Sequence, residues 1–298
     1  MRVLITGSAG FLGRHFAARL RADGHAVDGR DIADDPYGDA LEVFRYGTAS
    51  FDLVIHCAAV SPHRAAIDGK SLAVGAGNLA LDAALFEWAA RTRPGRVVYF
   101  SSSAAYPVNW QNGQPPYDLG EDDIELDDPE EPDAIYGWVK LTGERLAAAY
   151  RQQGGTVTVL RPFSGYGEDQ SADFPFGAFR DRAAAREDPF TIWGDGEQVR
   201  DWIHVDDVVG ATLAAVEQGV DGPLNLCTGV GTSMRELANL FLAEAGHTAW
   251  VDFQRDKPAG VAYRVGDPTR LHEIYKPRIS LQEGVRRALA EVVTHGAR

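Results

Sequence analysis

The stretch that most constrains the fold is TGSAGFLG (6–13), which directly follows the apolar run VLI (3–5). Glycine inside a helix costs about 1 kcal/mol relative to alanine, so three glycines at a strand-to-helix junction indicate a close backbone approach. A helix that begins there points its free N–H groups outward and can bind pyrophosphate. We interpret Gly7 as permitting a tight turn, Gly10 as permitting close approach of phosphate, and Gly13 as permitting close packing of the helix on the strand.

An acidic residue, Asp31, follows the second predicted strand, 24 residues after Gly7. A carboxylate at this place accepts hydrogen bonds from an adenosine ribose and repels a 2′-phosphate, which favours NAD over NADP. Arg30 beside it is able to accept that phosphate, so the preference between the two cofactors stays open. A plain turn-forming role for Asp31 is the alternative interpretation.

Short apolar runs alternate with amphipathic stretches through the first half of the chain, and most of these runs are almost continuously apolar. Strands buried on both faces have this pattern, which is typical of a parallel sheet covered by helices. We predict strands in RVLIT, HAVDGRD, FDLVIHCAA, GRVVYFSSS and TVTVLRP, and helices in LGRHFAARLRADG, NLALDAALFEWAARTR and YGWVKLTGERLAAAYRQQ. The fold class is therefore α/β, a Rossmann-like doubly wound parallel sheet.

The pattern loosens after residue 161, where a smaller C-terminal α/β lobe that binds substrate is predicted. We place the NAD-binding domain at 1–165 and the substrate lobe at 166–298, interleaved, with the chain returning to the first domain around 200–220. FTIWGDG and GPLNLCTG read as strands, and SMRELANLFLAEAG as a helix. HVDDVVGATLAAVEQ reads as a helix capped by Asp206 or Asp207. The Pro- and acid-rich loop 107–132 is predicted to be a lid or binding loop.

The net charge of −14 over 298 residues argues against nucleic acid or an anionic membrane as the main partner. It leaves room for a phosphate-bearing small molecule held by local arginines. Cys57 and Cys227 form no CxxC pair, which predicts free thiols in a reducing cytoplasm. No apolar run reaches the roughly 18 residues of a membrane span, and no signal-peptide pattern opens the chain. We expect a soluble, cytoplasmic protein.

The segment YGWVK places Tyr136 and Lys140 four residues apart, on one face of a predicted helix. A free phenol is too weak an acid to serve as a base at neutral pH, and a neighbouring ammonium favours the phenolate. Such a tyrosine can take a proton from a substrate hydroxyl while hydride leaves the same carbon. The upstream SSS (101–103) supplies hydroxyls that can converge on the same oxygen. An ordinary amphipathic helix and strand-end capping by serine are the alternatives.

Six motifs occur in one order along residues 1 to about 285: TGSAGFLG, HCAA (56–59), Asn78, FSSS (100–103), YGWVK (136–140) and GDGEQVRDWIHVDD (194–207). Together they resemble the extended short-chain dehydrogenase/reductase family, specifically its NAD-dependent nucleotide-sugar epimerase/dehydratase group. The resemblance implies NAD as the cofactor, a nucleotide-diphosphate sugar as the substrate, a homodimer, and no metal.

The resemblance also implies roles for individual residues. Tyr136 would be the catalytic base and Lys140 the residue that tunes it and orients NAD. The supporting hydroxyl is Ser102 when counted back from Tyr106 and Ser103 when counted forward from Phe100, and we place Ser102 first. The implied cofactor-binding residues are Gly7, Ala9, Gly10, Phe11, Leu12, Gly13, Asp31, Ile32, Cys57, Ala58, Ala59, Asn78, Tyr136 and Lys140. The implied substrate-binding residues are Ser103, Ser164, Arg200 and Arg264.

The two arginines would bind the diphosphate, because a guanidinium fork pairs well with phosphate oxygens. Surface ion pairs are the alternative for each. His63 and Arg64, in the loop after HCAAVSP, are further candidates for contact with the sugar.

The chain also departs from the family pattern. No Thr-Asp-Glu run follows the serines, and the 4,6-dehydratases of the family use that acidic pair, so a dehydratase is disfavoured. Ser164 stands where an asparagine often contacts substrate, and IYKP (274–277) replaces a usual Gly-Trp-Pro stretch.

We therefore predict an isomerase, a nucleotide-sugar epimerase acting most plausibly at C4 through a transient 4-keto sugar. A dehydratase, a decarboxylase and a ketoreductase are alternatives on the same scaffold, and a non-catalytic NAD-binding regulatory protein is the alternative of another class. The sequence leaves the sugar open, and the nucleotide is UDP, dTDP or GDP.

Overall fold

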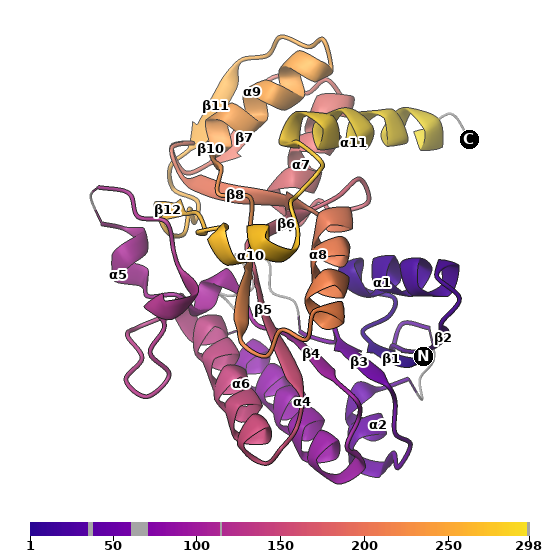
Figure 1. Cartoon of the computed structure of the whole chain (residues 1–298). Helices are drawn as coiled ribbons and strands as arrows, with labels where there is room; N and C mark the ends of the chain where they lie inside the picture. Colours follow the sequence, from indigo (N-terminus) through magenta and orange to yellow (C-terminus); the bar gives the residue numbers. More distant parts are fainter. Residues whose placement is uncertain (35–37, 61–70, 114, 297–298) are drawn as a thin grey trace.

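The computed structural model describes residues 1–34, 38–60, 71–113 and 115–296. Its centre is a parallel sheet of six strands in the order β2-β1-β3-β4-β5-β9 (Figure 1). The predicted Rossmann-like α/β fold is thereby confirmed. The strands are β1 (Arg2–Thr6), β2 (Ala26–Arg30), β3 (Leu53–His56), β4 (Val97–Phe100), β5 (Val157–Pro162) and β9 (Pro223–Leu226).

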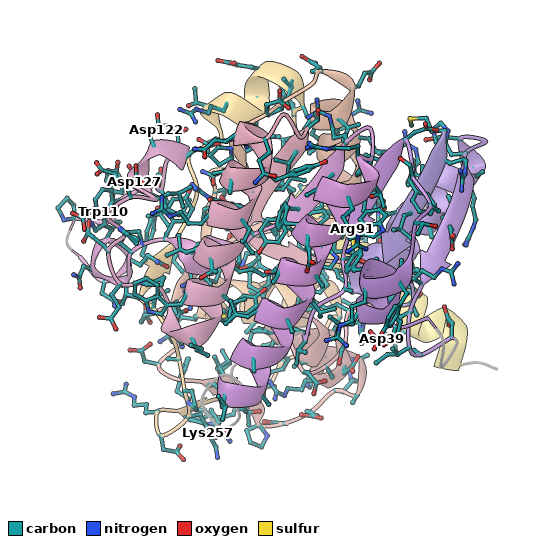
Figure 2. The ribbon with its side chains drawn as sticks, turned by 90° about the horizontal axis from the view of Figure 1, so that it is seen from below. Asp39, Arg91, Trp110, Asp122, Asp127 and Lys257 are labelled. Atoms are coloured by element: carbon teal, nitrogen blue, oxygen red, sulfur yellow. The ribbon has the colours of Figure 1, made fainter. Side chains whose placement is uncertain are left out.

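Helices cover both faces of this sheet, which is why its strands are apolar on both sides. Val3 and Ile5 of β1 point into one core cluster, and Leu4 between them points into the other. The first cluster lies under α1 (Phe11–Ala22), α8 (Val205–Glu217) and α10 (Thr269–Ile274). The second lies under α2 (Ala40–Tyr46), α4 (Ser71–Thr92) and α6 (Ala134–Gln152). Figure 2 shows α4 and α6 side by side on this second face. None of the helices in the described ranges is both long and apolar enough to cross a membrane.

The remaining elements form a C-terminal lobe above the sheet in Figure 1, around a third apolar cluster. In this cluster the ring of Phe176 lies 4.4 Å from that of Tyr166 and 5.0 Å from that of Phe241. Its strands are β6 (Ser164–Tyr166), β7 (Phe190–Trp193), β8 (Val199–His204), β10 (Gly231–Ser233), β11 (Val251–Gln254) and β12 (Tyr263–Arg264). Its helices are α7 (Pro175–Ala184), α9 (Met234–Glu244) and α11 (Leu281–Gly296).

The carboxyl edge of the sheet faces this lobe. β5 ends at Pro162, and β6 begins two residues later and pairs with β8 inside the lobe. Since the six strands are parallel, β1, β3 and β4 end at the same edge. Ligands of open α/β sheets bind at this edge, close to the point where the strand order reverses, which here lies between β1 and β3.

The acid-rich loop is closed at its base by a bridge between Pro107 and Pro132. It carries α5 (Val108–Gln111) and η2 (Glu121–Asp123), and it follows η1 (Ser103–Ala105). A second bridge joins Leu119 to Gly266, so the loop is attached to the strand region of the C-terminal lobe.

The predicted cap of α8 is wrong. The helix begins at Val205, and its cap is His204, whose Nδ1 accepts a hydrogen bond from the backbone N–H of Asp206 at 3.1 Å. β8 runs without a break into His204, which places Asp206 and Asp207 inside the first turn, where negative charge suits the helix dipole. Asp207 is buried and accepts a hydrogen bond from the Tyr275 hydroxyl at 2.8 Å.

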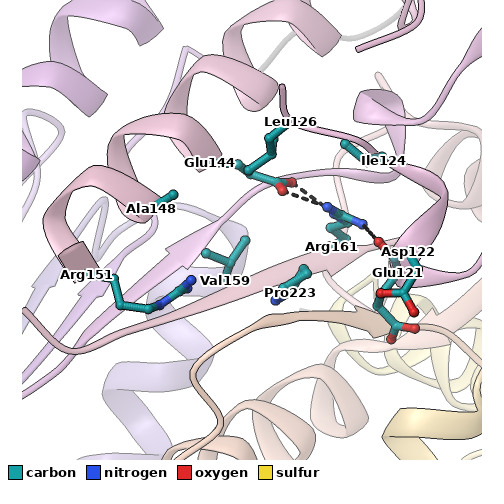
Figure 3. A pocket seen from close by; sticks show the side chains of 10 residues that line it. All are labelled: Glu121, Asp122, Ile124, Leu126, Glu144, Ala148, Arg151, Val159, Arg161 and Pro223. Atoms are coloured by element: carbon teal, nitrogen blue, oxygen red, sulfur yellow. Dashed lines mark hydrogen bonds and ion pairs between the residues drawn. The ribbon is translucent and has the colours of Figure 1, made fainter. Parts of the chain in front are cut away.

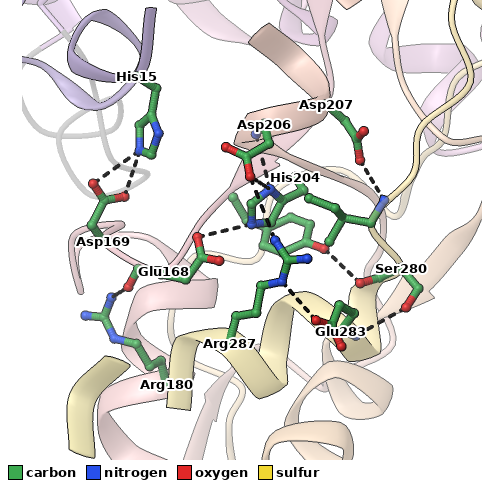
Figure 4. A network of polar contacts seen from close by, with 12 residues as sticks. His15, Glu168, Asp169, Arg180, His204, Asp206, Asp207, Ser280, Glu283 and Arg287 are labelled. Carbon is green, nitrogen blue, oxygen red and sulfur yellow. Dashed lines mark hydrogen bonds and ion pairs between the residues drawn. The ribbon is translucent and has the colours of Figure 1, made fainter. Parts of the chain in front are cut away.

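A polar network joins α1 to the C-terminal lobe (Figure 4). Asp169, just after β6, accepts hydrogen bonds from Arg14 at 2.6 Å and lies 3.1 Å from His15 Nε2. Its neighbour Glu168 lies 3.1 Å from Nε2 of the buried His204. Burial raises the pKa of Asp169, but hydrogen bonds from His15 and Arg14 outweigh burial and hold that pKa well below its ordinary value.

We expect the variant Asp169→Asn to melt about 2 °C below the parent protein at pH 7. The shift is small because the ion pair that is lost is partly exposed to water, and such pairs add little stability. A carboxyl whose pKa is lowered by folding stabilises the fold above its unfolded pKa, about 3.9, and loses this effect as the pH falls. The difference in Tm between the two proteins should therefore shrink below about pH 4. Thermal unfolding followed by circular dichroism from pH 3 to 7 measures it; a constant difference would contradict the assignment.

Candidate active site

The glycine loop between β1 and α1 packs directly onto the segment that follows β3. Gly7 has a φ of +70°, and a Cβ at this position would lie 2.6 Å from the backbone N of Ala58. A Cβ at Gly13 would lie 1.9 Å from the carbonyl oxygen of Gly7. Side chains at either place would separate the loop from its neighbours. The turn at Gly7 agrees with the prediction, and Gly13 allows close packing on the loop itself.

No side chain caps the N-terminus of α1. Gly10 is the N-cap and offers no side chain, and no acceptor in the described part of the chain binds the backbone N–H groups of Phe11, Leu12 and Gly13. Uncapped N–H groups at a helix N-terminus bind anions. The loop and helix start therefore fit the pyrophosphate of a dinucleotide such as NAD.

Asp31 folds over this loop from the end of β2. Its carboxylate accepts hydrogen bonds from the backbone N–H groups of Ala9 at 3.0 Å and of Ala33 at 2.9 Å. The guanidinium of Arg30 donates instead to Asp28 at 2.8 Å. The acid, and not the neighbouring arginine, thus lies against the glycine loop, as a ribose-binding carboxylate would. The next residue, Ile32, is 70% exposed.

The segment after β3 is braced by Asn78 of α4. The buried amide of Asn78 accepts from the N–H of Val60 at 2.9 Å and donates to the carbonyls of Val60 at 3.0 Å and Val74 at 2.9 Å. One donor holds the backbone at Val60, next to Ala59, and the other is bonded within α4 itself, so any contact with the cofactor has to use the amide oxygen.

Cys57 lies in the same segment, and burial raises the pKa of its thiol far above the ordinary value. It therefore packs as a neutral side chain. The sugar-contact candidates His63 and Arg64 lie outside the described residues.

The predicted base and its partner lie side by side near the N-terminus of α6. Lys140 is 4% exposed, and its Nζ donates to the carbonyl of Phe100 at 2.9 Å. The same Nζ lies 5.7 Å from the ring centroid of Tyr136 and 5.3 Å from that of Tyr99. The Tyr136 hydroxyl has no hydrogen-bond partner within the part of the chain that the structure describes. A phenol and an ammonium therefore meet at the carboxyl end of β4.

The three serines after β4 have different surroundings. Ser101 donates to Glu144 of α6 at 2.5 Å, deep in the protein. Ser102 is the N-cap of η1, and its oxygen accepts from the N–H of Ala104 at 3.1 Å. Ser103 is buried, and its hydroxyl has no hydrogen-bond partner among the described residues. Ser102 and Ser103 both keep a hydroxyl proton to donate, whereas Ser101 is committed to Glu144.

Glu144 fixes α6 against β5 through a buried ion pair (Figure 3). Arg161 donates to the two oxygens of Glu144 at 2.9 and 2.7 Å, and to the carbonyl of Glu121 at 2.8 Å. A cavity of about 180 Å³ lies beside this pair. Neither Tyr136 nor Lys140 lines it, so it belongs to the scaffold that supports α6.

The two predicted diphosphate arginines lie in neighbouring strands of the lobe. Arg200 of β8 and Arg264 of β12 are partners in the strand register. Arg264 donates to Asp133, the N-cap of α6, at 2.8 Å and to Gln111 at 2.5 Å. The pair of arginines is thus linked to the helix that carries Tyr136.

A second cavity, of about 310 Å³, lies beside Asp133, and neither Arg200, Arg264 nor Tyr136 lines it. It is lined by Val108, Asn112, Asp133 and residues 258–261. Arg200 reaches this segment by donating to the carbonyl of Ala259 at 3.3 Å. Ser164 begins β6, paired in register with Trp202 of β8, where the sheet passes into the lobe.

Sequence reasoning missed a buried polar group behind Lys140. Tyr99 donates to the carboxylate of Asp82 at 2.6 Å, and Asp82 lies 3.5 Å from His56 Nε2. Nδ1 of His56 shares a hydrogen bond of 2.8 Å with the hydroxyl of Thr6. One signal was present in the sequence: Asp82 is the acid inside the apolar run LALDAALF, four residues after Asn78.

The family model of the NAD-dependent epimerase/dehydratase family matches residues 3–227. The chain belongs to this family. The predicted family is thereby confirmed, and the protein is an NAD-dependent enzyme.

Relatives of full length carry several activities. The chain is 29% identical to dTDP-4-dehydro-6-deoxy-D-allose reductase of Streptomyces bikiniensis, with 95% of each protein covered. It is 28% identical to UDP-glucose 4-epimerase of Mycolicibacterium smegmatis, with 96% of each covered. Among solved structures, UDP-glucose 4-epimerase of Thermotoga maritima with UDP-glucose has a TM-score of 0.85 and 25% identity, and MoeE5 with UDP-glucose and NAD has 0.84 and 28%; each comparison covers 100% of both chains.

We expect Gly13→Ala to weaken NAD binding about tenfold, equivalent to about 1.4 kcal/mol. The added Cβ would overlap the Gly7 carbonyl, so α1 has to move away from the loop that it orients. Isothermal titration with NAD measures the effect. The control is Gly222→Ala, whose Cβ would meet nothing within 4 Å and whose affinity should match the parent protein. Equal NAD affinity in Gly13→Ala and the parent would contradict the assigned cofactor loop.

Proposed function

We propose that the protein is a nucleotide-sugar 4-epimerase that works through a transient 4-keto sugar. The observation that carries this proposal is the pairing of Tyr136 with Lys140 at the end of β4, beside hydroxyls of Ser102 and Ser103. The similarity to UDP-glucose 4-epimerases over the full chain length supports the same reaction. UDP-, dTDP- and GDP-sugars are the candidate substrates.

In this proposal Tyr136 is the catalytic base. It takes the proton from the C4 hydroxyl of the sugar and later returns it, and the Lys140 ammonium lies next to its ring. Gly7–Gly13 and Asp31 would hold NAD, which would supply the reversible hydride acceptor for C4. Ala58, Ala59 and Asn78 line or brace the cofactor site.

A serine hydroxyl donates to the C4 oxygen and stabilises the charge that develops there. We favour Ser103 over Ser102, since the oxygen of Ser102 already accepts a backbone hydrogen bond as a cap. This reverses the order suggested by counting from Tyr106.

The substrate diphosphate is bound by Arg200 and Arg264, and the sugar lies between them and Tyr136, with Ser164 as a further contact. The strand register supports this arrangement because it places the two guanidinium side chains on adjacent strands. With the diphosphate held, the 4-keto sugar can turn its other face to the hydride before reduction.

A ketoreductase is the second candidate. The chain covers 95% of dTDP-4-dehydro-6-deoxy-D-allose reductase at 29% identity, as close a likeness as that to the epimerases. The same Tyr136 and Lys140 would then deliver a proton to a keto oxygen while hydride is consumed and not returned.

We further propose that the protein acts in the cytoplasm as a homodimer. Cys57 and Cys227 are both free thiols, as suits a reducing compartment. Ile135 and Trp138 of α6 are 37% and 40% exposed, and Leu79 of α4 is 38% exposed, which leaves apolar surface on the two helices proposed as the interface.

We expect the purified protein to epimerise at least one sugar in a panel of UDP-, dTDP- and GDP-sugars, followed by NMR. A substrate deuterated at C4 should keep its label in the product, because the hydride is returned to the same carbon. Tyr136→Phe should lower kcat by about 100- to 10,000-fold and leave NAD affinity close to that of the parent protein. Stoichiometric loss of deuterium to free cofactor would identify the reductase instead, and full activity of Tyr136→Phe would exclude the proposed base.

We expect Ser103→Ala to lower kcat about 100-fold, the usual effect of removing one donor to a developing oxyanion. Ser102→Ala should mainly lower stability, by about 1 kcal/mol, because it removes the cap of η1. Steady-state kinetics and urea unfolding of both variants separate the two effects. A larger kinetic defect in Ser102→Ala would restore the order favoured by the spacing from Tyr106.

A further inference from the structure

A buried acidic residue, Asp82 of α4, lies behind the ammonium of Lys140 and has no part in the mechanism described so far. Its side chain is 2% exposed, and one carboxylate oxygen accepts a hydrogen bond of 2.6 Å from the Tyr99 hydroxyl. The face of the same Tyr99 ring lies 5.3 Å from Lys140 Nζ. Tyr99 therefore connects Asp82, at its hydroxyl, with Lys140, at its ring face.

A glycine in α6, Gly143, leaves the space that the Tyr99 hydroxyl occupies. A Cβ at Gly143 would lie 1.8 Å from the Tyr99 hydroxyl oxygen, so a side chain there would displace the phenol from Asp82. Burial, and then the Asp82 carboxylate, raise the pKa of Tyr99 well above its ordinary value. The phenol of Tyr99 thus keeps its proton and stays a donor to Asp82.

The Lys140 ammonium needs a compensating charge because it is buried. It donates one described hydrogen bond, to a neutral backbone carbonyl, and an uncompensated buried charge is costly. Glu144, one helical turn along α6, is a candidate, but its two oxygens already form an ion pair with Arg161 at 2.9 and 2.7 Å. Among the described residues, no arginine forms an ion pair with Asp82.

The other titratable groups beside Asp82 and Lys140 come from the end of β3 and the residue that follows it. His56 of β3 lies 3.5 Å from Asp82, a distance beyond good hydrogen-bond geometry, and its other ring nitrogen is bonded to Thr6. The Cys57 thiol is neutral, since burial raises its pKa. Burial raises the pKa of Asp82 as well, but Lys140, His56 and Tyr99 outweigh burial and hold that pKa below its ordinary value. Asp82 is therefore an ionised carboxylate.

We propose that Asp82 is a positioning residue that supplies the counter-charge of the Lys140 ammonium through the bridging ring of Tyr99. Removal of this charge makes it easier for the buried cation to lose its proton. At alkaline pH, Lys140 would then lose the charge with which it orients the cofactor and assists Tyr136. The turnover part of this inference rests on the proposed function, and its cofactor-binding part does not.

The test uses Asp82→Asn, which keeps the size of the side chain and an oxygen that accepts from Tyr99 but removes the charge. The matched control is Asp207→Asn. Asp207 is also buried and also accepts a hydrogen bond from a tyrosine hydroxyl, that of Tyr275 at 2.8 Å, but it lies at the start of α8. Asp207 also accepts hydrogen bonds of 2.9 Å from the backbone N–H groups of Arg278 and Ile279, so Asp207→Asn is the more disruptive variant and controls for loss of a buried carboxylate away from Lys140.

The first measurement is the NAD dissociation constant of each protein by titration between pH 6 and 10, without sugar. For Asp82→Asn we expect the alkaline weakening of NAD binding to begin about one pH unit lower than in the parent protein. Asp207→Asn should follow the parent curve. A parent-like curve for Asp82→Asn, or the same shift in both variants, would overturn the proposal.

The second measurement is the kcat–pH profile with the nucleotide sugar that the parent protein turns over. We expect Asp82→Asn to lower kcat about tenfold at pH 8 with little change in KM, and to move the alkaline limb to lower pH. If Asp82→Asn does not fold, Tyr99→Phe keeps the ring, removes the link to Asp82, and should move both curves in the same direction. Unchanged curves in Tyr99→Phe would then overturn the proposal. Absence of turnover in the parent protein refutes the proposed function alone, because the NAD titrations still decide on Asp82.

Discussion

The site depends on one hydrogen bond, from the buried ammonium of Lys140 to the carbonyl of Phe100. It joins α6 to the last residue of β4, at the edge where the sheet ends. An ammonium without water has to be bonded and compensated, so the side chain has little freedom to leave this position. Tyr136, one helical turn earlier, is thereby placed at the same edge as the serines that follow β4.

Other contacts hold the same helix from three directions. The Glu144–Arg161 ion pair attaches its middle to β5, and the Arg264–Asp133 pair attaches its N-terminus to the C-terminal lobe. Tyr99 and Asp82 connect it with α4 across the space left by Gly143. The base-bearing helix is thus positioned by buried charges, whereas the glycine loop on the other side of the site is positioned by backbone packing at Gly7 and Gly13. This division suits the tasks that we propose for them, because a proton-transfer pair needs a set electrostatic environment and a phosphate site needs open N–H groups.

The parts of this structure that follow local rules could be predicted from the sequence. Continuous apolar runs predicted the parallel sheet, and the i, i+4 spacing predicted that Tyr136 and Lys140 share a face. The cap of α8 could not be predicted, because His204 becomes the cap only when β8 runs straight into the helix. The roles of Asp82, Tyr99 and Glu144 depend on contacts between residues 17 or more positions apart, which no local pattern encodes. Likewise, three adjacent serines look alike in sequence, and only their partners in the fold distinguish Ser101 from the other two.

The distribution of charge reconciles an acidic protein with an anionic substrate. The chain carries a net charge of −14, yet Arg200 and Arg264 lie side by side on two adjacent strands of the lobe. Arg264 is bonded to Asp133 at 2.8 Å, so its charge is partly compensated and its side chain is oriented. A diphosphate that binds this arginine has to share it with the carboxylate of Asp133, the residue at the N-cap position of α6. In the arrangement that we propose, substrate binding in the lobe would be coupled, through the Arg264–Asp133 ion pair, to the start of the helix that carries Tyr136.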